Sequence, residues 1–300
     1  MAQDFCFGIQ CDDDLIASTL LPNYIKPAKG ENSLYDKIKI HLANTAEWIY
    51  TTFIDRSVAN GENREEFVEV FQPLLIAESL RRALSSLDLV LTPNGFAVTS
   101  TSNLTPASAQ RVAALHEELI DVRDLAIRRW LQDARMPKAA NTAQSEFFSK
   151  SLFCDFDIID RVGESLGDSL PRSAWNRFLA LRQRALEVQG EIERKWIGPE
   201  LMRELCLKNY QIRYSDEDTE SRTKFIISPQ GNVAMNLLQI ISNAIVKKKM
   251  LFDQRWALVE IVDYIRKRPD SFQTWHNSPI AEIFNPPIFH NEKKSAGFFF

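Results

Sequence analysis

Apolar residues recur every three or four positions along most of this chain, which is the spacing of an amphipathic helix. The pattern becomes regular at Ser33, a residue type that caps helices by accepting a hydrogen bond from a free backbone N–H. The apolar positions of this first helix are Ile38, Leu42, Ala46, Ile49 and Phe53. The pattern therefore predicts a helical body that begins near residue 33.

Further helices follow at similar spacing. A second one carries Pro73, and we expect a kink or a restart there because proline lacks the backbone donor. A third is expected to start at Thr105, which precedes a proline, and to run to about residue 136. Helical pattern returns at 173–196, and one long helix is expected after residue 231.

Two short segments interrupt the helical pattern and resemble each other. LVLTPNGFAVTS (89–100) and KFIISPQGNVAM (224–235) each combine an apolar run, a proline-containing turn and a glycine. Such segments are typical of β-hairpins. Two hairpins in similar helical surroundings predict an internal duplication, although a turn pattern of four residues also recurs by coincidence.

The predicted fold is mainly α: a helical bundle with two short β-hairpin insertions. It consists of an irregular leader (1–32), a first helical repeat (33–137), a second repeat (138–268) and an extended aromatic C-terminal arm (269–300). Four prolines prevent a long helix in the arm. Its many aromatic rings gain from burial, so the arm is expected to dock either on its own body or on a neighbouring subunit.

Composition narrows the class of protein. Apolar residues make up 45% and charged residues 25%, as in an ordinary globular protein. The net charge of −4 gives no electrostatic case for direct nucleic-acid binding. We expect no signal peptide, because acidic residues stand where a cationic and then an apolar segment would be needed, and no membrane segment, because no long apolar run occurs. The four cysteines lack zinc or disulfide spacing, so we expect thiols kept reduced in a bacterial cytoplasm.

No residue constellation indicates catalysis. The four histidines lack zinc-protease spacing, and GESLGD (163–168) is neither a P-loop nor a dinucleotide fingerprint. Acidic residues gather at 12–14 and again at Asp155, Asp157 and Asp160, where a solvated edge is the simplest interpretation. The sequence predicts no catalytic residue, no metal and no cofactor, and hence no enzyme. A metal-dependent hydrolase or nuclease using Asp155 and Asp157 is the alternative of another class.

Basic residues are expected on the long helix after residue 231. They are Lys247, Lys248, Lys249 and Arg255, followed by a second group at 266–268. A solvated face is the default interpretation, and an acidic patch on a protein partner is the next. The second interpretation leads to an alternative function, a cytoplasmic helical scaffold or adaptor that binds one protein partner.

One resemblance points to a specific function. The run from Phe67 to Ile127 resembles an uncharacterised family of roughly this length, associated with prophages of Bacteroidetes and their virion-assembly genes. Its most distinctive piece is LVLTPNGFAVTSTSNLTPAS (89–108), and the aromatic end after EKKSAG is also similar. The resemblance implies a virion structural protein, a head-to-tail connector or neck adaptor, and no known catalytic residues.

The resemblance also implies partners and contact elements. A connector is made in the bacterial cytoplasm, is located in the virion, oligomerises into a ring and meets portal, tail or neck components. Ring contacts join one patch to a different patch on the next copy. The hypothetical interface lies in the first hairpin and the arm, at Pro93, Asn94, Gly95, Phe96, Phe284, Phe289, Phe298, Phe299 and Phe300.

Overall fold

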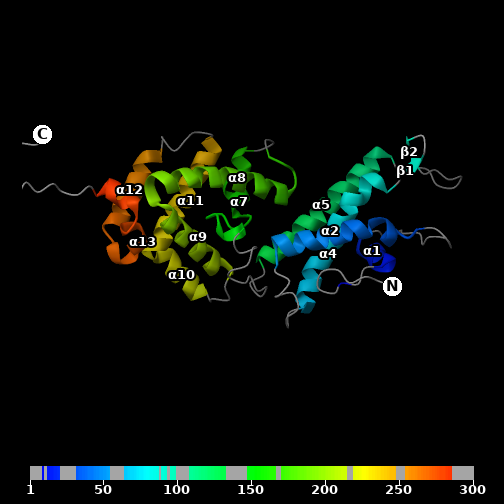
Figure 1. Cartoon of the computed structure of the whole chain (residues 1–300), viewed down its shortest axis with the longest axis horizontal. Helices are drawn as coiled ribbons and strands as arrows, with labels where there is room; N and C mark the ends of the chain where they lie inside the picture. The colour runs from blue at the N-terminus through cyan, green and yellow to red at the C-terminus, as the bar shows by residue number, and fades with distance from the viewer. Residues whose placement is uncertain are drawn as a thin grey trace, which may run out of the picture.

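Two helical lobes make up the elongated molecule in Figure 1. The computed structural model describes residues 9, 12–20, 32–54, 64–87, 89–92, 95–98, 108–132, 147–166, 170–214, 219–247 and 254–285. Most of these residues are helical, which confirms the mainly α fold. The hydrophobic core extends through both lobes.

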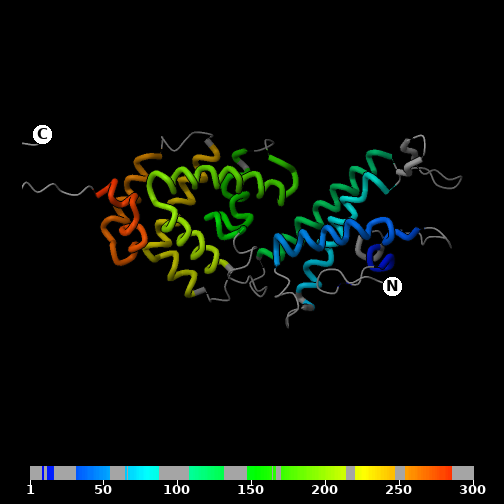
Figure 2. The backbone as a smooth tube through the Cα atoms, viewed as in Figure 1, coloured from blue at the N-terminus to red at the C-terminus, as the bar shows by residue number. Residues whose placement is uncertain are grey.

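The N-terminal lobe contains the first elements of the chain. They are α1 (Asp13–Leu20), α2 (Leu34–Thr52), α4 (Arg64–Ala83), the 3₁₀ turn η2 (Leu84–Ser86), β1 (Leu89–Thr92), β2 (Gly95–Val98) and α5 (Ala109–Gln132). Helix α4 packs against both α2 and α5, and the tube in Figure 2 shows these three long helices side by side. Every apolar position predicted for α2 is buried.

Local chemistry explains where these helices begin. Ser33 caps α2 as expected, since its hydroxyl oxygen accepts a hydrogen bond from the backbone N–H of Asp36 at 3.1 Å. Helix α4 continues through Pro73, so no restart occurs there, and the alternative, a kink, stays a prediction. Helix α5 begins at Ala109 rather than near Thr105, and the Ser108 side chain accepts from the Arg111 N–H at 3.4 Å. Ser108, the residue directly before the helix, therefore provides the cap.

The segment expected to form an irregular leader is partly helical. Asp12 begins α1 by accepting a hydrogen bond from the Leu15 N–H at 2.8 Å. Asp13 accepts one from the Tyr35 N–H at 2.7 Å and so links α1 to the start of α2. Ile9 and Ile16 are buried. Carboxylates 12 and 13 therefore bind backbone donors in the structure.

The two segments predicted to be hairpins fold differently. Strands β1 and β2 pair antiparallel, with Leu91 opposite Phe96 and Thr92 opposite Gly95. At 224–235 the prediction is wrong, because α10 (Thr219–Ile227) and α11 (Pro229–Lys247) are helices. The Ser228 hydroxyl accepts from the Gly231 N–H at 3.1 Å, and Pro229 is the first helical residue. Serine followed by proline starts a helix as readily as a turn, so the duplication inferred from two hairpins loses its basis.

The C-terminal lobe contains the remaining elements. They are α7 (Asp157–Leu166), α8 (Ala174–Ile192), the π-helical turn η4 (Glu193–Ile197), α9 (Pro199–Tyr214), α10, α11, α12 (Arg255–Arg266), the 3₁₀ turn η6 (Pro269–Ser271), α13 (Gln273–His276) and α14 (Pro279–Phe284). Gly198 has φ +84°, a conformation that favours glycine, and it redirects the chain from η4 into α9. The long helix expected after residue 231 is two helices, α11 and α12.

The segment that begins at residue 269 is not an extended arm over its described part. Phe272 and Trp275 are fully buried, and the Trp275 indole N–H donates to the Trp196 carbonyl at 3.2 Å. Phe284 stacks on Trp196 with ring centroids 5.7 Å apart. Residues 269–285 therefore dock on their own body, while Phe289 and 298–300 lie outside the described residues.

Aromatic rings join the two lobes. Phe53, at the end of α2, lies 5.3 Å from Trp130 of α5 and 5.2 Å from Trp175 of α8, measured between ring centroids. Phe148, just before α7, lies 5.5 Å from Trp130 and 6.4 Å from Phe178. We call these five residues the aromatic junction. Each ring buries on the order of 150–250 Å², so the junction is a large part of the contact between the lobes.

Replacing Phe53 with Ala should lower the free energy of unfolding by about 3–5 kcal/mol, because it opens a cavity where both lobes meet. Guanidinium unfolding followed by circular dichroism measures this change. Ile40→Ala, at an exposed position of the same helix, should change it by no more than about 0.5 kcal/mol. Equal effects of the two substitutions would contradict a central role for the junction.

Candidate functional site

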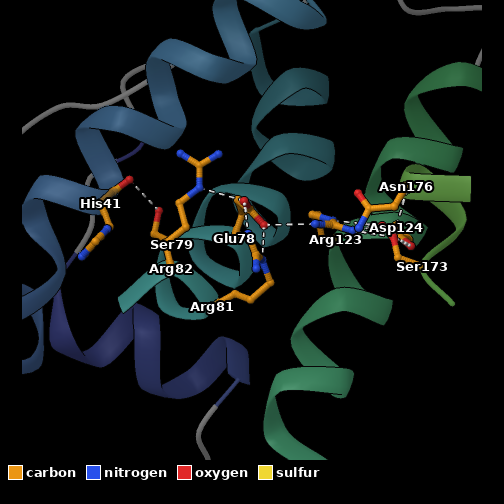
Figure 3. A network of polar contacts seen from close by, with 9 residues as sticks. All are labelled: His41, Glu78, Ser79, Arg81, Arg82, Arg123, Asp124, Ser173 and Asn176. Atoms are coloured by element: carbon orange, nitrogen blue, oxygen red, sulfur yellow. Dashed lines mark hydrogen bonds and ion pairs between the residues drawn. The ribbon is translucent and has the colours of Figure 1, made fainter. Parts of the chain in front are cut away.

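Figure 3 shows a buried network of ionic groups. It adjoins the aromatic junction at Trp175, whose backbone N–H donates to Asp124 at 3.3 Å. Glu78 of α4 accepts hydrogen bonds from Arg81 at 2.7 and 2.9 Å and from Arg82 at 2.8 Å. Its carboxylate also lies 3.4 Å from Arg123 of α5. Since Glu78 and Arg123 are both buried, water does little to screen this interaction.

The same network crosses to the C-terminal lobe. Arg123 contacts Asp124 at 2.8 Å and donates to the Ser173 hydroxyl at 2.7 Å. Ser173 in turn donates to Asp124 at 2.9 Å and caps α8 by accepting from the Asn176 N–H at 3.2 Å. Trp175 therefore enters the aromatic junction from a helix whose first turn is fixed by groups of the N-terminal lobe.

The charge state of Glu78 follows from its neighbours. Burial alone would raise its pKa, but the hydrogen bonds from Arg81 and Arg82 and the charges of Arg81 and Arg123 lower the pKa from 4.5 to about 2. The carboxylate is therefore ionised at neutral pH, and its negative charge is balanced by Arg81, Arg82 and Arg123. Such a group stabilises the fold and is a poor proton donor or acceptor near pH 7.

A second ionic cluster contains the two acidic residues that the sequence left as metal-ligand candidates. Asp155 contacts the Arg213 guanidinium at 2.6 Å, and Asp157 pairs with the same group. Asp155 also accepts from the Asp157 N–H at 2.9 Å, which caps α7. These carboxylates face an arginine from α9 in the structure. Among the described residues, no group of three or more His, Cys, Asp or Glu side chains could hold a metal ion.

Two cysteines lie near this cluster. Cys154 and Cys206 are both buried. Burial is the largest cause that raises the pKa of Cys154 to about 12, and the nearby Asp155 charge also raises it. Burial likewise raises the pKa of Cys206. Protonated thiols at neutral pH are weak nucleophiles and weak metal ligands.

A cavity of about 230 Å³ lies between α7, α9, α10 and α11. We call it the α10 cavity. Its lining is mainly apolar and includes Ile212, Phe225, Ile226 and Met235, with Arg161 and Arg222 as exposed basic residues. Gly231 positions this site, because a Cβ there would lie 1.9 Å from the Phe225 carbonyl oxygen. Only glycine lets α11 approach the end of α10 so closely.

A groove of about 340 Å³ separates α11 from α12. Asn232, Asn236 and Asn243 line one side, and Gln254 and Tyr264 line the other. Two of these amides bond each other along α11, since Asn236 donates to the Asn232 side chain at 3.1 Å. The groove is hydrogen-bonding and nearly neutral, with Glu260 as its acidic member.

The predicted site residues are widely separated. Gly95 and Phe96 lie in β2 of the N-terminal lobe, whereas Phe284 docks on the C-terminal lobe. Pro93 and Asn94 fall outside the described residues, as do Lys248 and Lys249. Lys247 ends α11 and Arg255 begins α12, so these two residues do not share the one long helix predicted for them, while the basic face itself stays a prediction. Sequence reasoning also missed the buried network, whose members come from segments 45–50 residues apart.

These features define a two-lobed, mainly helical protein whose lobes meet through aromatic rings and a buried ionic network. No helix in the described ranges combines the length and hydropathy needed to cross a bilayer. The model of a family of unknown function, DUF6712, matches residues 23–133, a range that includes α2, α4, both strands and α5. No curated protein and no solved structure matches the chain.

Replacing Glu78 with Gln should destabilise the protein most at neutral pH. The pKa of Glu78 is about 2 in the folded protein and 4.5 in the unfolded chain. The ionised carboxylate therefore contributes stability that is fully present above pH 4.5 and is lost as the pH falls towards 2. At pH 7 the loss should be on the order of 3 kcal/mol, because Arg81 and Arg82 lose the carboxylate that they pair with and buried Arg123 keeps only Asp124. Chemical unfolding at pH 7 and pH 3 measures the difference.

Glu69→Gln, at an exposed position of the same helix, is the matched control and should change stability by less than about 0.5 kcal/mol at either pH. If Glu78→Gln lost as much stability at pH 3 as at pH 7, the ionised network would not be the cause.

Proposed function

We propose that this chain is a structural protein of a phage virion, a head-to-tail connector that assembles into a ring. The resemblance of the segment 89–108 suggests the role. The observation that carries the proposal is the exposure of large apolar side chains on both lobes of a firmly joined body. An assembly protein needs such surfaces, because its contacts with other chains bury them.

The most exposed of these side chains lie in the C-terminal lobe. Trp256 of α12 is 81% exposed, Ile227 at the end of α10 is 77% exposed and Ile283 of α14 is 72% exposed. The N-terminal lobe exposes Ile40 and Leu125. Tryptophan is enriched among the residues that dominate binding energy, and exposing it to water without a partner gains nothing for the fold.

Two different surfaces on one body suit a ring. A cyclic assembly of more than two copies repeats one heterologous contact, in which a patch on one copy meets a different patch on the next. The aromatic junction and the buried network hold the lobes together, so contacts at both ends transmit a fixed angle from copy to copy. Two lobes joined by these contacts are therefore a suitable ring subunit.

Disruption of the gene in a host that carries the encoding prophage should separate the two halves of the virion. Without a connector, DNA-filled heads and finished tails should both accumulate but fail to join. Electron microscopy of induced lysates, with a plasmid copy of the gene as the control that restores joining, tests this outcome. Complete infectious particles from the disrupted strain would refute the connector function.

A further inference from the structure

The α10 cavity combines an apolar interior with two arginines that lack acidic partners. Arg222 donates one hydrogen bond, to the Arg213 carbonyl at 3.1 Å. Neither Arg161 nor Arg222 makes an ion pair with any described residue. Beside them, Ile226 is 54% exposed and Met235 is 37% exposed. An apolar group flanked by carboxylates would satisfy both parts of this site.

The N-terminal lobe presents such a group on α5. Glu118, Asp121 and Leu125 follow one another at spacings of three and four residues, so they share one face of the helix. All three are exposed, and Leu125 is 50% exposed. Neither Glu118 nor Asp121 forms an ion pair among the described residues. We call these three residues the α5 face.

The net charges of the two halves of the chain are also opposite in sign: the N-terminal half is acidic and the C-terminal half is slightly basic. Residues 1–137 contain 13 Lys and Arg against 19 Asp and Glu, which gives −6. Residues 138–300 contain 23 Lys and Arg against 21 Asp and Glu, which gives +2. Complementary potentials of this kind steer partners together and fix their register.

We infer that the α10 cavity of one copy receives the α5 face of a second copy of this chain. Leu125 enters the apolar cavity beside Ile226 and Met235, while Glu118 and Asp121 pair with Arg161 and Arg222. This inference deepens the proposed function and rests on it, because it identifies the contact that repeats around the ring.

The position of the two surfaces favours a second copy. Figure 1 shows α5 in one lobe and α10 in the other, on opposite sides of the junction. A contact between them in two copies is heterologous and leaves one free surface of each kind. It therefore propagates from copy to copy until the ring closes.

Charge reversal on each surface tests the pairing. The full chain is prepared with Glu118→Arg and Asp121→Arg, with Arg161→Glu and Arg222→Glu, or with all four changes. Sedimentation velocity over a range of concentrations measures self-association. Each two-site variant should weaken association by about tenfold or more, and the four-site variant should recover it. An equimolar mixture of the two-site variants should also recover it.

Matched controls change the same charge elsewhere. Glu65→Arg with Glu69→Arg on α4, and Lys37→Glu with Lys39→Glu on α2, should associate like the wild type, and circular dichroism should show all variants folded. If both surface variants associate normally, or if the four-site variant stays dissociated, the pairing is wrong while wild-type rings still support a connector. A wild type that is monomeric at every concentration also overturns the pairing, and the head–tail joining phenotype then decides the connector function separately.

Discussion

The structure depends on the contact between two lobes, in which a hydrophobic and an ionic component reinforce each other. The rings of Phe53, Trp130, Phe148, Trp175 and Phe178 exclude water from the junction. Exclusion of water makes the neighbouring interaction of Glu78 with Arg123 stronger than it would be in solvent. In return, the network fixes the first turn of α8 through Ser173 and so holds Trp175 in place. Neither component would orient the lobes as well by itself.

The contact between the lobes determines the angle at which the proposed ring contact would repeat. A surface on α5 and a cavity beside α10 define a repeating angle only if the lobes keep one orientation. Buried ion pairs add modestly to stability, since desolvation offsets much of their attraction, but a misaligned packing that separates the partners leaves a buried charge uncompensated, which is strongly unfavourable. The buried network is therefore better understood as a device for orientation than as a large source of stability.

Sequence patterns predicted most helices, but they did not always identify the residue at which a helix begins. Ser33 caps α2 as its residue type predicts, whereas the serine that caps α5 is Ser108, and the candidate near Thr105 precedes it. The two segments predicted to be hairpins show the same limit. One contains the paired strands β1 and β2, whereas in the other Pro229 begins α11, because Ser228 and Pro229 form a helix start when Gly231 allows α10 to pack closely. Local chemistry allowed both outcomes.

The candidate sites were even less accessible to sequence reasoning. The sequence allows Asp155 and Asp157 as metal ligands, but in the structure both pair with Arg213, more than fifty residues away along the chain. Glu78, Arg123 and Ser173 carried no motif at all. Residue spacing reports only neighbours on the same element, so contacts between elements leave no periodic signal.

By itself, the sequence determined the helical class, the buried face of α2 and the need to bury the aromatic rings that follow residue 269, because periodicity and residue type act locally. Tertiary structure alone decided that residues 269–285 dock on their own body, that the long helix divides into α11 and α12, and that the lobes meet through rings and ion pairs. These outcomes depend on which surfaces become neighbours in space, and chain order does not specify that.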